Sequence, residues 1–143
     1  MKWAQGFYKL KNPKKYIGKN RPRFRSSWEF QFMKFCDDHQ SVLQWASESI
    51  HINYRNPFTS KMTIYVPDFF VVYVDKNGSK HAEVVEVKPA NQTFREAVGK
   101  SAARQAEYVK NMAKWEAANA WCKQQGIKFR IVSENDLFHN GSR

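Results

Sequence analysis

The sequence predicts an α/β protein in which a central mixed β-sheet is flanked by helices. Three features predict this fold class: a capped helix that begins near residue 26, several strand-like runs within residues 42–88, and a long helix at 102–125 before a last strand at 127–132. A helix that connects two strands can return the chain to a parallel neighbour. We therefore expect the sheet to contain both parallel and antiparallel pairs.

Size and composition limit the classes of protein to which the chain can belong. Its 143 residues are enough for one domain with a hydrophobic core, and its net charge of +11 favours a polyanionic partner such as nucleic acid. It has no apolar run of the ~20 residues needed to cross a bilayer and no apolar signal core at its start. Cys36 and Cys122 are too few for a disulfide framework, and the four histidines are scattered. We expect reduced thiols, no closed zinc site, no membrane partner and a cytoplasmic setting.

Much of the basic charge lies in residues 1–25, which we assign to a basic N-terminal arm before a domain at residues 26–143. The arm holds nine Lys or Arg residues and no Asp or Glu, and its prolines and glycines predict irregular backbone. Aromatic residues between these charges suit either stacking on nucleic-acid bases or packing on the domain. The candidate DNA-binding residues are Lys14, Lys15, Lys19, Arg21, Arg23 and Arg25, together with Lys100 and Arg104 near the start of the long helix.

The first helix is predicted to begin after Ser26 and to end near Asp38 or His39. Ser26 as N-cap with Glu29 three residues later fits a capping box. The apolar residues that follow have helical spacing: Trp28, Phe32, Phe35 and Cys36.

The middle of the chain is predicted to form strands. Residues 42–54 suit one or two strands, and residues 64–66 lead into Pro67 and Asp68. The β-branched and aromatic run at 69–74, the turn residues at 75–78 and the run at 80–88 predict a β-hairpin.

The long helix at residues 102–125 is predicted from its Ala, Gln, Glu and Lys content, with Gly126 at its C-terminal end. The expected core-facing stripe consists of Val109, Met112, Trp115, Ala118 or Asn119, and Cys122. After the strand at 127–132, Ser133 is expected to begin a short terminal helix.

Two carboxylates and a lysine on the hairpin, Asp68, Glu86 and Lys88, are the candidate catalytic residues. A two-residue turn would place Asp68 opposite Val87 and away from Glu86. A three-residue turn at 76–78 would place Asp68 opposite Glu86, and the glycine at its last position favours this longer turn. Carboxylates that meet in this way can bind Mg²⁺, and a nearby lysine can stabilise charge on a phosphate.

Structural roles are the alternatives for the same residues. Asp68 could cap a turn after its proline, and Glu86 with Lys88 could form an ordinary same-face ion pair. Glu29 could serve its own helix. Glu83 faces the other side of the strand from Glu86 and is a poor ligand candidate, while Glu48 has no supporting pattern.

The order of these residues resembles the PD-(D/E)xK nuclease superfamily, which includes phage endonuclease I. The matching positions are Pro67-Asp68 and Glu86-Val87-Lys88, with Glu29 on the preceding helix. The resemblance implies a restriction-endonuclease-like fold and a Mg²⁺ site, at which Mn²⁺ can substitute. It implies Asp68, Glu86 and the Val87 carbonyl as ligands, and a Lys88 that orients the attacking water or stabilises the phosphate. It implies that Glu29 completes the site, through a second ion or a water.

Several longer blocks resemble the phage head-completion nuclease family, at residues 6–16, 25–29, 45–48, 67–70 and 86–89. This resemblance implies an endonuclease that processes DNA ends during head completion, in the cytoplasm of an infected host or in association with the virion. The implied partners are DNA and portal, neck or tail proteins. Two alternatives stay open: a catalytically inactive DNA-binding structural protein of the phage neck, and a dimeric junction-resolving nuclease. The sequence leaves the oligomeric state open.

Overall fold

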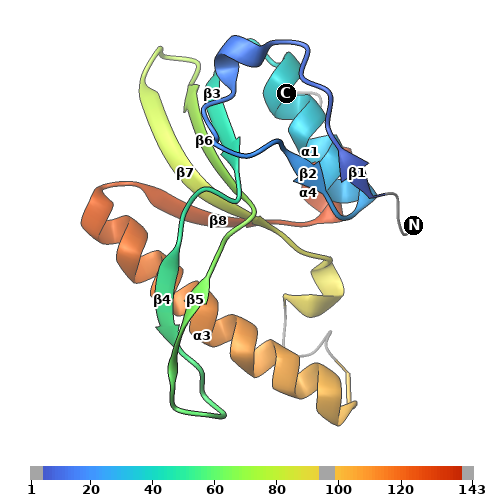
Figure 1. The fold of residues 1–143 in the computed structure, drawn as a ribbon, viewed down its shortest axis with the longest axis vertical. Coiled ribbons are helices and arrows are strands. Elements are labelled where there is room, and N and C mark those ends of the chain that lie inside the picture. Colours follow the sequence, from blue (N-terminus) through green and yellow to red (C-terminus); the bar gives the residue numbers. More distant parts are fainter. Residues whose placement is uncertain (1–4, 94–98, 140–143) are drawn as a thin grey trace.

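The computed structural model describes residues 5–93 and 99–139, and its elements confirm the predicted α/β class with a central mixed sheet between helices (Figure 1). None of its helices in these ranges is long and apolar enough to cross a membrane. In chain order the elements are β1 Gly6–Phe7, the 3-10 helix η1 Pro13–Lys15, β2 Arg23–Phe24, α1 Ser27–Asp38, β3 Val42–Ser47, β4 Ile52–Arg55, β5 Met62–Tyr65, β6 Phe69–Val74, β7 Lys80–Val87, the 3-10 helix η2 Ala90–Gln92, α3 Ala102–Gln125, β8 Lys128–Val132 and α4 Glu134–His139.

The central sheet has four strands in the order β3-β6-β7-β8. The first two pairs are antiparallel, and β7 pairs with β8 in parallel after the chain has crossed over through α3. The expected mixture of strand directions is therefore confirmed. The predicted region at 42–54 forms two strands, of which β4 leaves the central sheet and pairs with β5 in a separate two-stranded ribbon.

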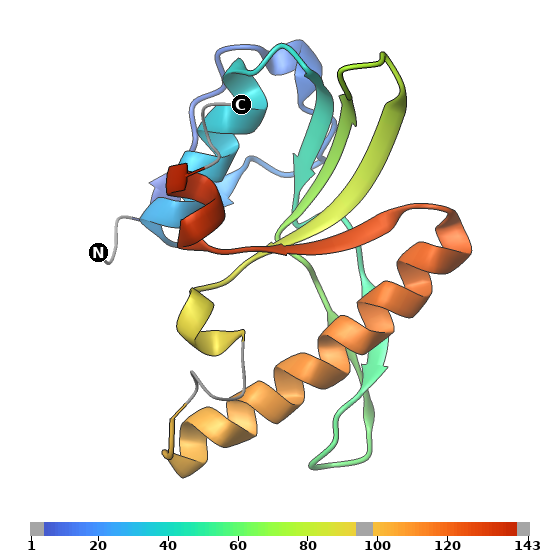
Figure 2. The ribbon, with the colours of Figure 1, turned by 180° about the vertical axis from the view of Figure 1, so that it is seen from behind.

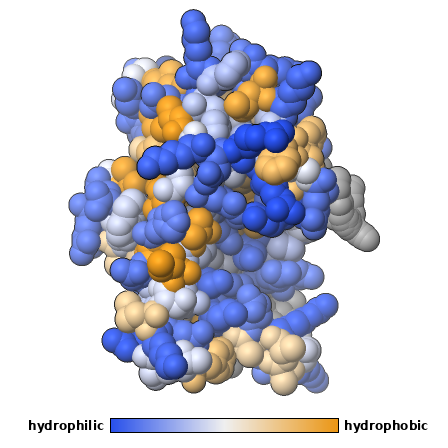
Figure 3. Space-filling view, viewed as in Figure 1, coloured by the Kyte–Doolittle hydropathy of each residue, from blue (hydrophilic) through white to orange (hydrophobic). Residues whose placement is uncertain are grey.

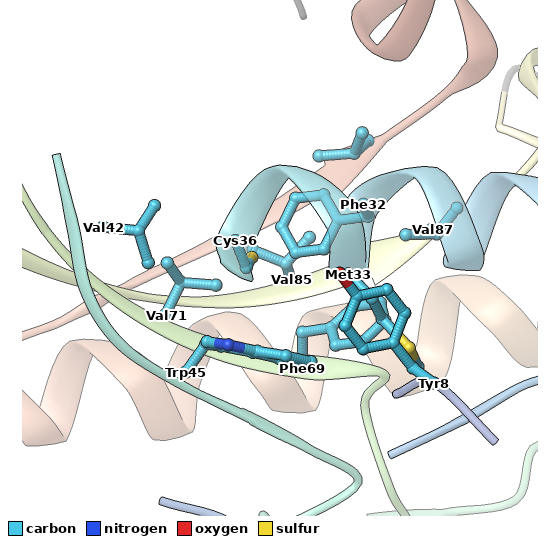
Figure 4. Packing of buried hydrophobic residues seen from close by; sticks show 11 residues of the cluster. Tyr8, Phe32, Met33, Cys36, Val42, Trp45, Phe69, Val71, Val85 and Val87 are labelled. Atoms are coloured by element: carbon cyan, nitrogen blue, oxygen red, sulfur yellow. The ribbon is translucent and has the colours of Figure 1, made fainter. Parts of the chain in front are cut away.

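The two long helices cover opposite faces of the sheet (Figures 1 and 2). Side chains alternate along a strand, so Val85 and Val87 of β7 face one side and Glu86 faces the other. The first side packs against α1 residues such as Phe32 and Met33, as Figure 4 shows. On the second side Phe129 and Ile131 of β8, the strand next to β7, pack near α3.

The described part of the N-terminal segment is more ordered than the predicted irregular arm. It contains the antiparallel pair β1–β2 and the short helix η1. Tyr8 is buried, and the Tyr16 ring lies 4.8 Å from that of Trp45, so these aromatics pack on the domain. Trp3 lies outside the described residues. The structure does not test whether the segment is a separate unit, so the division at residue 25 stays a prediction.

The core-facing stripe of α3 was predicted correctly only in its C-terminal half. Trp115, Ala118 and Cys122 are buried, but Val109 and Met112 are exposed, as is Asn119. Asn111 is buried instead, because it lies one helical turn before Trp115 on the same face. The elements that pack against α3 therefore determine which of its faces is buried, and the apolar pattern alone did not identify that face.

Candidate active site

The β6–β7 hairpin has the three-residue turn that the glycine position favoured. Asp75 donates its backbone N–H to the carbonyl of Ser79 over 2.9 Å, and Gly78 takes the left-handed conformation with φ of 81°. The ladder runs from Val74 opposite Lys80 to Phe69 opposite Val85. One further step places Asp68 opposite Glu86, as predicted.

Asp68 lies at the end of this ladder, between the two neighbouring chain segments. Its Oδ2 accepts the backbone N–H of Val87 at 2.8 Å, and its backbone carbonyl accepts that of Glu48 at 2.9 Å. Burial, followed by the charges of Glu86 and Glu29, raises the pKa of Asp68 well above its usual value. The three carboxylates therefore lie within electrostatic reach of one another.

Glu86 is buried, with 6% of its surface exposed, and two other side chains hold its carboxylate. The Tyr65 hydroxyl donates to Oε1 at 2.7 Å, and the Lys88 ammonium lies 3.5 Å from Oε2. Burial raises the pKa of Glu86, and Lys88, the Tyr65 hydroxyl, the Asp68 backbone amide and Lys114 partly oppose that rise. The structure thus brings Asp68, Glu86 and Lys88 together.

Glu29 comes to the same region from the first turn of α1. Its backbone N–H donates to Ser26 Oγ at 3.1 Å, which confirms the predicted N-cap. Its carboxylate accepts the backbone N–H of Arg25, one residue before the position that a full capping box would use. Burial, and the nearby charges of Glu48 and Glu86, raise the pKa of Glu29, while Arg25 opposes the rise. Glu29, in the first turn of α1, therefore also adds negative charge to the site.

Glu48 has a place beside the site that the sequence did not indicate. Its carboxylate pairs with the Arg25 guanidinium. Its backbone φ is 51°, in the left-handed region that few non-glycine residues adopt. The hydrogen bond from the Glu48 backbone N–H to the Asp68 carbonyl stabilises this strained conformation and joins the end of β3 to the start of β6.

Tyr65 and Lys114 are site residues that sequence reasoning missed. The Lys114 ammonium lies 5.6 Å from the centre of the Tyr65 ring and 6.0 Å from that of Tyr54. Burial lowers the pKa of Lys114, as do the nearby charges of Lys110 and Lys88. No local motif marks either residue, because only the packing of α3 on the β4–β5 ribbon brings them to Glu86.

Glu83 is another carboxylate of β7, but it lies on the face of the sheet opposite to Glu86. Its oxygens pair with Arg130 Nε at 2.8 Å and with the Tyr73 hydroxyl at 2.6 Å. The prediction that Glu83 is a poor ligand candidate is consistent with this, since its oxygens already have partners on the other face of the sheet.

The donor set at Asp68 and Glu86 fits a hard divalent cation. Two carboxylates supply the oxygen ligands that Mg²⁺ prefers. A dication would offset the burial that raises the pKa of both groups and the repulsion from Glu86 and Glu29 that raises the pKa of Asp68 further. Within residues 5–93 and 99–139, no group of three or more His, Cys, Asp or Glu side chains is arranged to hold a metal. The Val87 carbonyl and Glu29 therefore stay predictions as further ligands.

Of the candidate DNA-binding residues, one is half-buried and seven are exposed. Lys15 is half-buried, and its ammonium donates to the backbone carbonyls of Asp37 and His39 at 2.9 Å each. It therefore caps the C-terminal end of α1. Arg25 pairs with Glu48, and Arg21 lies over the ring of Phe7. The exposed residues are Lys14, Lys19, Arg21, Arg23, Arg25, Lys100 and Arg104.

Comparison with known proteins shows what the sequence of the chain is similar to. Residues 39–134 match the model of the TnsA-like endonuclease N-terminal domain. The chain is also 30% identical over 137 residues to the head completion nuclease of Enterobacteria phage T4, an alignment that covers 89% of each chain. The matched regions include Asp68, Glu86 and Lys88.

Proposed function

We propose that this chain, which belongs to the family of phage head completion nucleases and carries a TnsA-like endonuclease domain, cuts DNA by divalent-metal-dependent hydrolysis. The family makes it a nuclease that acts on DNA. The metal requirement and the kind of cut are our proposals. The observation that carries them is the meeting of Asp68 and Glu86 at one end of the β6–β7 ladder, with Lys88 beside Glu86.

Each residue of the site has a chemical role in this proposal. Asp68 and Glu86 would hold Mg²⁺, or Mn²⁺ in its place, with the Val87 carbonyl and Glu29 as supporting groups. When bound, such an ion would supply an activated water and polarisation of the phosphate. Lys88 orients the attacking water or stabilises the negative charge that develops on the phosphate oxygens. Tyr65 fixes one oxygen of Glu86, and the other oxygen lies beside the Lys88 ammonium.

The substrate is duplex DNA, and the exposed basic residues hold its backbone. The net charge of +11 and the exposed Arg and Lys side chains near α1 and α3 favour phosphate contacts. The similarity to the head completion nuclease of phage T4 supports a role in head completion. We extend this to processing of DNA ends, with portal, neck or tail proteins as partners, in the infected host cytoplasm or the virion.

Cleavage of supercoiled and linear DNA in Mg²⁺, Mn²⁺ and EDTA tests the chemistry. Glu86→Gln should abolish cleavage, whereas Glu83→Gln, on the same strand but paired with Arg130 and Tyr73, should retain it. Equal activity of the two variants, or cleavage in EDTA, would contradict the proposed site. DNA binding without cleavage in any divalent ion would instead support a structural DNA-binding protein. Faster trimming of linear than of closed circular DNA would support the role in end processing.

A further inference from the structure

The β4–β5 ribbon projects away from the central sheet and begins at the candidate active site. In Figures 1 and 2 it crosses α3, with its loop at residues 56–61 at the far end. Tyr65, the last residue of β5, donates its hydroxyl to Glu86, and two residues later Pro67 leads into Asp68. A molecule that contacts the Tyr65 end of the ribbon therefore lies next to the site of proposed hydrolysis.

The two faces of the ribbon differ. One face packs on α3, where Ile52, Tyr54 and Tyr65 are buried with Trp115 and Ala118. The other face carries the opposed pairs Asn53–Ile64 and Arg55–Met62, and all four residues are exposed. Ile64 and Met62 each keep 57% of their surface exposed, which is unusual for two neighbouring apolar residues on one strand.

The tip of the ribbon is held in shape by its own polar groups. Asn56 Oδ1 accepts the backbone N–H groups of Phe58 and Thr59, and the Arg55 guanidinium donates to the carbonyl of Ser60 at 2.6 Å. Phe58 is 59% exposed at this tip. The ribbon thus presents a preorganised apolar surface.

The charged residues of the ribbon indicate which kind of partner its exposed face fits. Residues 49–67 contain Arg55 and Lys61 and no Asp or Glu, although acidic residues lie directly on both sides, at Glu48 and Asp68. In the lower part of Figure 3, where the ribbon lies, apolar side chains alternate with hydrophilic ones. A polyanion with apolar groups on its surface complements such a face.

We propose that the exposed face of the β4–β5 ribbon lies in the major groove of duplex DNA beside the cut, an inference that rests on the proposed nuclease function. The major groove, about 12 Å wide, admits a two-stranded ribbon. Asn53 can contact adenine edges there, and Ile64 and Met62 can contact thymine methyl groups. A strand of four residues spans about 10 Å, so these contacts lie within about three base pairs of the scissile phosphate.

Probing with dimethyl sulfate on a 30-base-pair duplex, without divalent ions, tests the groove. The reagent methylates guanine N7 in the major groove and adenine N3 in the minor groove, so one experiment reports both grooves. The bound wild-type protein should protect N7 over a few neighbouring base pairs and leave N3 reactive. Protection of N3 alone, or of neither atom, would overturn the proposal.

Matched substitutions locate the contact on the protein. Ile64→Glu and Met62→Glu should each weaken duplex binding at least about tenfold and remove the N7 protection, since each places a negative charge against the groove. Leu43→Glu makes the same change at an exposed residue of β3, outside the ribbon, and should bind as the wild type does. If both ribbon variants keep wild-type affinity, the proposal fails. A changed solution mass with unchanged DNA affinity would mark the face as a protein interface and also overturn it.

Hydrolysis of bis(4-nitrophenyl) phosphate separates this inference from the proposed function. That small diester needs no groove contact, so Ile64→Glu should hydrolyse it at the wild-type rate while binding duplex DNA poorly. Loss of both activities in a folded Ile64→Glu protein would contradict a role confined to the groove. Failure of the nuclease proposal would show independently, as retained cleavage by Glu86→Gln.

Discussion

Two aspartates of this molecule, Asp37 and Asp68, experience opposite surroundings. Asp37, at the end of α1, is fully buried, and its carboxylate accepts hydrogen bonds from the Tyr8 hydroxyl and the backbone N–H groups of Lys11 and Asn12, at 2.8 to 3.0 Å. Asp68 accepts the N–H of Val87 and lies beside Glu86 and Glu29. Burial raises the pKa of Asp37, but its hydrogen bonds outweigh burial and lower that pKa overall, whereas the pKa of Asp68 is raised.

The difference distinguishes a carboxylate that stabilises the fold from one that, in the proposed function, binds a metal ion. The donors around Asp37 come from residues 8–12, so this side chain fastens the N-terminal segment to α1. Asp68 keeps negative charge in excess of what its neighbours neutralise. In the proposed function, a bound cation would offset that repulsion.

The largest effect is expected for Asp68→Asn. The change should lower the rate of DNA cleavage by about 10³-fold or more, because a bound metal contributes several kcal/mol to such a reaction. It should leave the thermal stability of the metal-free protein unchanged or raised, since it removes one of the repelling charges. Cleavage rates and calorimetry on the same preparation check both parts. A large fall in Tm would show that Asp68 is structural, as Asp37 is.

Lys88→Met is expected to lower kcat by about 10²- to 10³-fold, because the developing phosphate charge loses its ammonium partner. Lys80→Met removes an exposed lysine at the other end of the same strand and serves as control, with little expected change. Steady-state cleavage at saturating Mg²⁺ measures both variants. A loss that higher Mg²⁺ restores would assign Lys88 to metal binding rather than to the chemical step.

Asp37→Ala should destabilise the protein by about 3 kcal/mol, because three buried or half-buried donors lose their acceptor. Asp38→Ala is the matched control, since this neighbour is exposed and pairs with Lys11 at 3.9 Å. Urea unfolding gives both free energies. The folded fraction of Asp37→Ala should cleave DNA normally at low temperature, so a direct loss of activity would argue against a purely structural role.

Tyr65→Phe should weaken metal binding by about 10- to 100-fold, because Glu86 loses the hydroxyl that orients it. Tyr73→Phe removes a similar bond, from tyrosine to Glu83, on the other face of the sheet and should leave metal binding unchanged. Titration of cleavage rate against Mg²⁺ compares the two. Equal apparent affinities would remove Tyr65 from the site.

The smallest effect is expected in the pH dependence of stability. The folded-state pKa of Asp37 lies below its unfolded value, so its stabilisation is present above about pH 4 and is lost as pH falls through the lowered pKa. The pKa of Asp68 is raised, so its contribution is present below about pH 4 and is lost as pH rises through the raised value. Unfolding of the metal-free protein should therefore show a shallower acid slope in Asp37→Ala. Asp68→Asn should show a smaller loss of stability towards neutral pH, and identical curves for all three proteins would contradict both assignments.

Local sequence rules predicted the elements well where one rule acted alone. The N-cap at Ser26, the strand Phe69–Val74 and the helix Ala102–Gln125 were all predicted with their observed limits. Gly78 predicted the turn, and the turn determined the register that brings Asp68 to Glu86. The α3 stripe failed at Val109 and Met112, because several apolar faces were available and the neighbouring elements decided between them.

By itself, the sequence determined the fold class, the hairpin and the identity of its carboxylates and lysine. These follow from spacing along one strand pair, where a side chain's direction depends on its own backbone and turn. Only the tertiary structure decided that Tyr65 and Lys114 join Glu86, that Asp37 receives its donors from the N-terminal segment, and that the acid-free β4–β5 face stays exposed. The physical reason is that hydrogen bonding, burial and repulsion act between groups far apart in the chain, and no local pattern records which of them will meet.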